Sequence, residues 1–179
     1  MTRSLLVSVL LLGFASTTFA ANRENFDLFK DVSEQVNRYA LLTIFDSVSA
    51  EVDDGYVTLS GKVTQPYKAT EIEKRVARLD GVEGVRNTIE VLPVSSFDDR
   101  LRVGIARALY AHPNLRMYGL GSTPSIHVIV EHGRVTLDGV VNNNADRVIA
   151  NSVAQSFMAF EIKNELKTTS EWKQLLETL

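Results

Sequence analysis

The sequence predicts an α+β protein made of two α-β-β-α-β units, each a three-stranded mixed sheet covered by two helices. Two observations predict it. The segments 55–63 and 133–141 are identical at six of nine positions, at an offset of 78 residues. Apolar residues alternate inside both segments, as in strands, and recur every three or four residues in the segments around them, as in helices.

The first 20 residues predict a secretory signal peptide. Arg3 supplies the positive start, Leu5 to Leu12 is an apolar run too short to span a bilayer, and Thr18-Phe19-Ala20 resembles a cleavage site. A buried N-terminal helix is the alternative. We therefore leave residues 1–20 out of the fold and expect a periplasmic protein. We expect it not to be a lipoprotein, because the sequence contains no cysteine to carry lipid.

Each unit is predicted to begin with a helix and to carry a second helix after its first two strands. The apolar stripes of the first unit are Val32, Val36 and Ala40, then Ala69, Ile72, Val76 and Leu79, with Pro66 near the start of the second helix. The stripe of the other unit is Leu101, Ile105 and Leu109, and its second helix is expected from Asn144 to Phe157.

The strands are predicted from turns and alternation. Asp54-Gly55 and His132-Gly133 are typical of tight hairpins. Val57, Leu59, Val135 and Leu137 are expected to be buried. Gly61 and Gly139 interrupt the apolar face, which predicts a bulge or the close approach of another backbone, expected to be a helix. A third strand with Val85, Ile89 and Val91 closes the first unit.

The chain is predicted to divide into residues 21–94, 95–167 and 168–179, with a short linker at 93–96. The last segment is expected to be an amphipathic helix capped by Ser170. Its apolar stripe is Trp172, Leu175, Leu176 and Leu179. Because so short a helix is unstable alone, it must dock on its own domain, a partner or a membrane.

Two apolar residues of the second unit, Ile129 and Val140, fall on the sheet face that should be polar. Their counterparts in the first unit are Glu51 and Lys62. We therefore expect this face to be covered by the other domain, by the C-terminal helix or by a second chain.

Composition and motifs exclude most kinds of catalytic, metal and nucleotide site. The absence of cysteine excludes disulfides and thiolate catalysis. His112, His127 and His132 show no metal-ligand spacing, and the loop Gly119–Pro124 lacks the features of a phosphate loop. We predict no catalytic residue, cofactor or metal. No basic stripe indicates nucleic-acid binding, since residues 21–94 carry 9 basic and 13 acidic residues and residues 95–179 carry 9 of each.

The repeated pattern, Gly-x-Val-x-Leu-x-Gly-x-Val followed by a helix and Gly-Val-x-x-Val-x-Asn, resembles the BON domain family. The first copy has the whole pattern: Gly55, Val57, Leu59, Gly61, Val63, Gly81, Val82, Val85 and Asn87. The second keeps Gly133, Val135, Leu137, Gly139, Val141, Ile162 and Asn164, but has Met158 and Ala159 in place of the Gly-Val pair. With its signal peptide and tandem arrangement, the chain is similar to OsmY-type periplasmic stress proteins.

The resemblance implies a non-enzymatic envelope or osmotic-stress protein that contacts anionic phospholipid or an envelope protein. A chaperone-like holdase for periplasmic or outer-membrane clients is the alternative. Oligomeric state is left open.

The predicted contact lies in the second unit, where an insertion at 113–124 follows a helix rich in arginine. Arginines beside apolar residues are typical of interfacial membrane contacts. The predicted residues are Arg100, Arg102, Arg107, Leu115, Arg116, Met117, Tyr118 and Leu120. The alternative is that the insertion packs on its own core or against the first unit.

Overall fold

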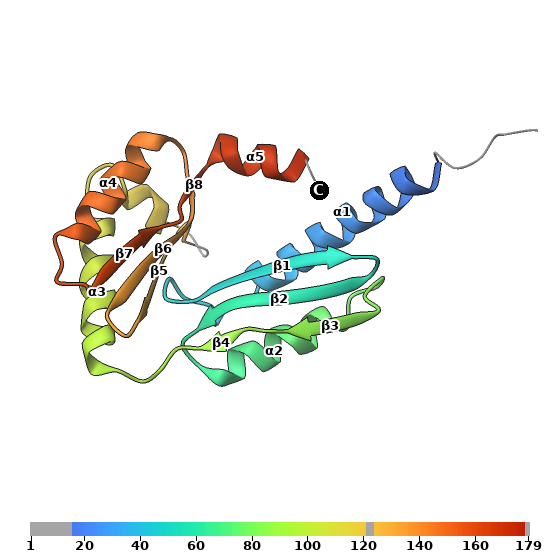
Figure 1. Cartoon of the computed structure of the whole chain (residues 1–179), viewed down its shortest axis with the longest axis horizontal. Coiled ribbons are helices and arrows are strands. Elements are labelled where there is room, and N and C mark those ends of the chain that lie inside the picture. The colour runs from blue at the N-terminus through green and yellow to red at the C-terminus, as the bar shows by residue number, and fades with distance from the viewer. Residues whose placement is uncertain (1–15, 121–123, 178–179) are drawn as a thin grey trace, which may run out of the picture.

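The computed structural model describes residues 16–120 and 124–177, with side chains from residue 25 onward, and contains two units of the same order (Figure 1). The first consists of α1 (Ser16–Asn37), β1 (Ser47–Asp53), β2 (Tyr56–Val63), α2 (Pro66–Val76), β3 (Gly84–Asn87) and β4 (Glu90–Val91). The second consists of α3 (Ser96–Ala111), the 3-10 turn η1 (Arg116–Gly119), β5 (Ile126–Glu131), β6 (Arg134–Val141), α4 (Asn144–Gln155), β7 (Glu161–Asn164) and β8 (Lys167–Thr168). The helix α5 (Thr169–Glu177) follows.

Both sheets are mixed, as predicted. β1 pairs antiparallel with β2, and β3 pairs parallel with β2; β5, β6 and β7 repeat the arrangement. The predicted third strand is divided into β3 and β4, both parallel to β2. Asn87 stands at the break: its side chain accepts from the Ile89 amide and donates to the Ala69 carbonyl of α2. Asn164 makes the same bonds to Leu166 and Arg147, so this asparagine ties the third strand to the helix in both units.

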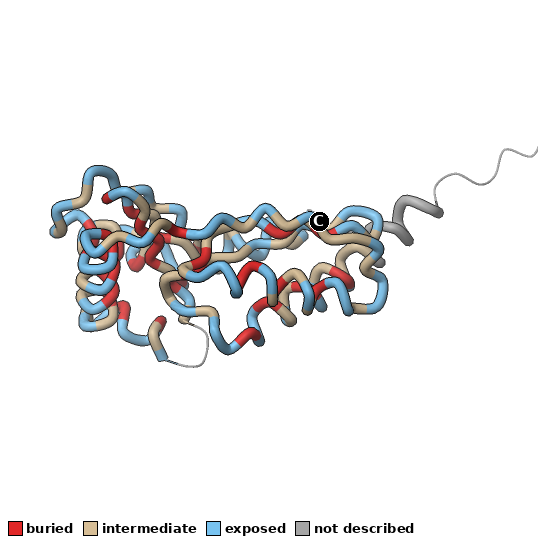
Figure 2. Tube along the Cα trace, turned by 90° about the horizontal axis from the view of Figure 1, so that it is seen from below, coloured by how far each residue is buried: buried red, intermediate tan, exposed pale blue. Residues whose placement is uncertain are grey.

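Each unit has its own apolar core between its helices and one face of its sheet. Val57, Leu59, Val135 and Leu137 are fully buried, which confirms the predicted strand faces. Buried residues lie on the inner sides of the helices and along the central strands, while exposed residues cover the outside (Figure 2). The helix stripes are also buried, apart from Leu79, which is partly buried, and Ala40, which is exposed. Since α1 ends at Asn37, Tyr39 enters the core in place of Ala40.

The hairpin turns are as predicted, because the residue pairs Asp54-Gly55 and His132-Gly133 all have positive φ. The expectation that a helix approaches Gly61 and Gly139 is wrong. At Gly139, φ is +121° and an added Cβ would lie 2.1 Å from the Ser125 carbonyl oxygen, at the start of the neighbouring strand. Gly61 meets the Ser47 carbonyl in the same way. Neighbouring-strand backbone therefore requires glycine at both sites.

The predicted signal peptide lies mainly in residues 1–15, outside the described part of the chain. Cleavage after Ala20 would remove the first turn of α1 and leave the part that carries the core residues Leu28, Val32 and Val36.

The two units are joined through the edge and outer face of the second sheet. The Ile44 carbonyl, in the connector between α1 and β1, accepts a 2.7 Å hydrogen bond from the Val128 amide of β5. Ile44 and Phe45 also pack against the core of the second unit. On the outer face, Lys62 of β2 forms a 2.5 Å ion pair with Glu131. Docking of the first unit therefore protects the β5 edge.

The expectation that the outer face is covered is confirmed. Ile129 is buried, and Val140 is half-buried. The Ser47 hydroxyl donates to the Asp138 carboxylate on the same face, which places the end of the first sheet against it.

The C-terminal helix is present, but Thr168 rather than Ser170 caps it. The Thr168 hydroxyl accepts from the Glu171 amide, and the Glu171 carboxylate accepts from the Thr168 amide, which makes a reciprocal capping box. Arg147 of α4 pairs with the same carboxylate. Thus α5 is fixed at its first turn, while Trp172 and Leu175 of its apolar stripe are exposed.

Candidate interaction surface

The exposed side of α3 carries a stripe of arginines interrupted by an apolar residue. Ser95 caps the helix by accepting from the Asp98 amide, which fixes where it begins. Arg100, Val103 and Arg107 then follow at spacings of three and four residues, so all three project from one side. Within the described chain, neither arginine has a carboxylate partner. Both charges therefore remain available to an external anion.

Three of the predicted contact residues are not on this surface, and their prediction is wrong. Arg102 is only 5% exposed, and it donates to the Val130 carbonyl. Leu115 is fully buried in the core of the second unit. Tyr118 is 6% exposed, and its hydroxyl bonds to Asp146 and to the Asn142 amide. The insertion thus packs Leu115 and Tyr118 on the core of its own unit, while Arg102 is buried on α3.

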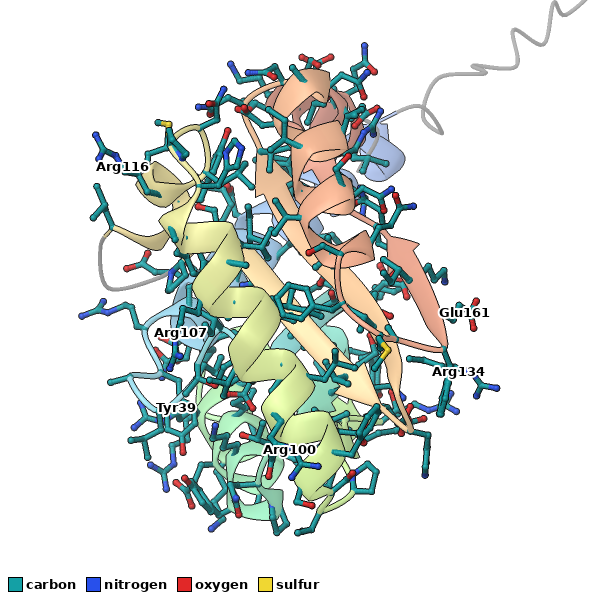
Figure 3. All side chains as sticks on the ribbon, turned by 90° about the vertical axis from the view of Figure 1, so that its left-hand side faces the viewer. Tyr39, Arg100, Arg107, Arg116, Arg134 and Glu161 are labelled. Atoms are coloured by element: carbon teal, nitrogen blue, oxygen red, sulfur yellow. The ribbon has the colours of Figure 1, made fainter. Side chains whose placement is uncertain are left out.

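The rest of the insertion faces outward. Arg116, Met117 and Leu120 are exposed at the turn η1, directly after α3. Arg100, Arg107 and Arg116 follow one another along α3 and the turn beyond it (Figure 3). Gly121, Ser122 and Thr123 of the predicted loop lie outside the described residues. The stripe of arginines thus ends in two exposed apolar side chains.

A second apolar group lies at the other end of α3. The Phe97 and Phe160 rings stack at a centroid distance of 6.1 Å. Phe160 is 80% exposed, and the neighbouring Met158 is 90% exposed. We call Phe97, Met158 and Phe160 the aromatic tip. Three large apolar side chains held in water are costly, which indicates a surface that meets something apolar.

The aromatic tip is built on a rigid base. The Asp98 carboxylate accepts from the amides of His132 and Gly133, and this fixes the β5–β6 hairpin against the start of α3. The Phe160 amide donates to the Gly133 carbonyl. In the first unit, the equivalent bond runs from the Glu83 amide to the Gly55 carbonyl. The same position therefore carries a charged residue in one unit and an exposed phenylalanine in the other.

Sequence reasoning missed the aromatic tip and Val103. One signal was available, since the second unit departs from the repeated pattern at Met158 and Ala159, where the first has Gly81 and Val82. A large apolar residue in place of a small one on a loop indicates a surface feature.

Residues 25–120 and 124–177 contain no group of three histidine, aspartate or glutamate side chains able to hold a metal. His127 has a buried Nδ1 with no hydrogen-bond partner in the described part of the chain, and His132 is exposed in the hairpin. In the described chain, no helix combines the length and apolar character that a membrane crossing requires.

The strongest polar network is internal to the first unit. The Asp46 carboxylate accepts hydrogen bonds from Lys68, Thr64 and Thr43. Burial opposes ionisation, but these hydrogen bonds outweigh it and hold the pKa of Asp46 below its ordinary value. Since every lone pair of the carboxylate faces a donor of the fold, this network holds structure rather than a ligand.

Comparison with known proteins gives one family match. The family model described as BON domain matches residues 28–93 and 98–169. No protein of curated function matches. Two solved structures of CdsD, a structural protein of the type III secretion system of Chlamydia trachomatis, are similar at 16% identity. One, its C-terminal domain, has a TM-score of 0.34 and covers 85% of this chain and 69% of that one. The other has a TM-score of 0.30 and covers 84% and 97%. At this identity and TM-score, neither structure indicates a function for this chain.

Proposed function

This chain belongs to the BON domain family, with two copies of the domain, and from that membership we propose that it is a periplasmic binding protein that contacts anionic phospholipid through its second BON domain. The observation that carries the proposal is the exposed side of α3, where arginines with no carboxylate partner among the described residues lie between two apolar groups. The protein is proposed to act without catalysis, during envelope or osmotic stress.

The arrangement suits a bilayer surface. Arginine guanidinium groups bind phosphate oxygens through paired hydrogen bonds, and each basic residue near an anionic leaflet contributes about 1 kcal/mol. The aromatic tip and the pair Met117 and Leu120 lie at opposite ends of α3. With the helix lying along the membrane, both groups would enter the boundary between headgroups and acyl chains, while Arg100 and Arg107 meet the phosphates.

The two domains differ in the way that this proposal requires. The second carries no net charge, whereas residues 21–94 carry a net charge of −4. An anionic surface therefore repels the first domain and tolerates the second. The first domain also has Glu83 at the position of Phe160. Binding is thus expected to orient the molecule, with the second domain toward the lipid.

Sedimentation with vesicles tests the proposal. The protein should bind vesicles that contain phosphatidylglycerol at low salt, bind more weakly as salt rises, and ignore vesicles of phosphatidylcholine. The variant Arg100→Glu/Arg107→Glu should lose binding. Arg38→Glu/Arg86→Glu, at two exposed arginines of the first domain, is the matched control with the same change in charge and should retain most of it.

Equal loss in both double variants would show that only net charge matters, and would overturn the assignment to α3. If the wild type suppresses aggregation of an unfolded protein but binds no vesicle at low salt, the exposed surface serves a protein client instead, and the lipid proposal fails.

A further inference from the structure

We propose that the first domain carries a separate site for a phosphate-bearing ligand, in a groove between α1 and α2. The groove is lined by Gln35 of α1 and by Glu71, Lys74, Arg75, Arg78 and Leu79 of α2 and the turn that follows. It encloses about 270 Å³. This volume lies below the roughly 300–1,000 Å³ of sites for drug-sized ligands, so it suits one small charged group.

The charges in the groove favour an anion. Arg75 and Arg78 have no carboxylate partner in the described chain, and only Lys74 is paired, with Glu71 at 3.0 Å. The carbonyl end of α2 contributes about half a negative charge, which two unpaired guanidinium groups exceed. The local charge is thus positive, although the domain as a whole is acidic.

A contact with Tyr39 holds Arg75 in place and leaves the hydrogen-bond donors of its guanidinium available to a ligand. Its guanidinium lies 5.0 Å from the centre of the Tyr39 ring, and Tyr39 is buried in the core. This stacking fixes the plane of the guanidinium while leaving its hydrogen-bond donors unspent. Among the described residues, Arg75 Nε is a buried donor with no hydrogen-bond partner, and the Tyr39 hydroxyl also has none. Buried polar groups are normally paired, so an unpaired donor beside a charged groove points to a missing acceptor.

The second domain lacks this site. At the offset of 78 residues, the positions of Lys74, Arg75 and Arg78 are taken by Ser152, Val153 and Ser156. The cations therefore serve no requirement of the fold. A phosphate group carries the negative charge and the acceptor oxygens that two guanidinium groups and an ammonium group can bind together. Arginine binds such oxygens in its fork geometry.

Titration with inorganic phosphate and with glycerol 3-phosphate tests this site, with chloride added to keep ionic strength constant. The readout is the NMR signal of the arginine Nε–H groups and of the α2 amides. We expect saturable shifts at Arg75 and Arg78, weakened about tenfold or more by Arg78→Gln and by Arg75→Lys, which keeps the charge but loses the fork. Glu71→Gln should tighten binding, because Glu71 is the one acidic side chain among the described residues that line the groove.

Arg86→Gln, at an exposed arginine of β3 outside the groove, is the control and should leave the titration unchanged. Shifts that grow linearly without saturating, or that chloride alone reproduces, would overturn the proposal. So would an Arg78→Gln variant that binds as the wild type does. The source of the phosphate is separated by adding vesicles of phosphatidylglycerol to the Arg100→Glu/Arg107→Glu variant. Displacement of glycerol 3-phosphate assigns the groove to a lipid headgroup, and no displacement assigns it to a soluble phosphate ester.

Discussion

The ammonium nitrogen of Lys68 lies 2.6 Å from a carboxylate oxygen of Asp46, and both side chains are almost completely buried. The pair joins the start of α2 to the connector that precedes β1. That connector also carries Ile44 and Phe45 into the second domain. The buried ion pair therefore positions the segment through which the two domains meet.

Breaking this pair should be costly. Asp46→Asn leaves the Lys68 charge buried without a counterion, and we expect a loss of about 3–5 kcal/mol in the free energy of unfolding, measured by urea denaturation. The double variant Asp46→Leu/Lys68→Met removes both charges and should lose much less than the sum of the two single changes. Additive losses would contradict the coupling.

The same pair sets a response to acid. Because the pKa of Asp46 is lowered on folding from an ordinary value of 3.8, its contribution is fully present above that value. It disappears as the pH falls through the folded-state pKa. Unfolding free energy measured from pH 6 to pH 2 should therefore decline more steeply below about pH 4 in the wild type than in Asp46→Asn. Parallel curves would exclude the role.

A different pair occupies the same position in the second domain. At the offset of 78, Asp146 replaces Lys68 and Asn142 replaces Thr64, while the Tyr118 hydroxyl takes the place of the Asp46 carboxylate. Tyr118→Phe would leave the buried Asp146 and the Asn142 amide short of a partner, at a cost of about 1–3 kcal/mol in urea denaturation. Tyr56→Phe, at an exposed tyrosine, is the control and should have little effect. Equal stabilities would contradict the network.

Gly139→Ala should destabilise the protein beyond the cost of backbone conformation alone. The new Cβ would meet the Ser125 carbonyl, which cannot move without breaking the start of β5. Gly81→Ala is a matched control, because Gly81 also has positive φ but its Cβ would meet only Leu28 at 3.8 Å. We expect a loss of about 1 kcal/mol in the control and clearly more at Gly139, measured by thermal unfolding. Similar losses in the two variants would mean that the strain of a positive φ alone explains why glycine stands at position 139.

The interface between the domains predicts coupled motion. Ile129→Lys places a charge on the covered sheet face while leaving both cores intact. We expect ¹⁵N relaxation to show one tumbling time for both domains in the wild type and faster, separate tumbling in this variant. Thr136→Lys, at a half-buried position on the same face, is the less disruptive comparison. Unchanged tumbling in Ile129→Lys would show that the connector alone holds the domains.

The sequence predicted the fold well because the information is local. The repeat located both units, and alternation fixed the buried face of β2 and β6. The cap of α5 is also local, because Thr168 and Glu171 form a capping box that can be recognised in the sequence, although the predicted cap was Ser170.

The surface was harder to predict because it depends on tertiary packing. Tyr118 and Leu115 are residue types that are typical of an exposed interfacial loop. Both side chains are nevertheless buried in the core of the second unit. Phe97 and Phe160 are far apart in the sequence, and only the contact between α3 and the β5–β6 hairpin brings their rings together.

The central claim is that the second domain enters the lipid surface, and a single reporter tests it most directly. Trp172 is the only tryptophan. In a Trp172→Phe background, Phe160→Trp should show blue-shifted emission and quenching by phospholipids brominated on the acyl chains, in vesicles that contain phosphatidylglycerol. Tyr56→Trp, at an exposed position in the first domain, should show neither. Quenching at both positions, or at neither while the protein stays bound to the vesicles, would contradict the account.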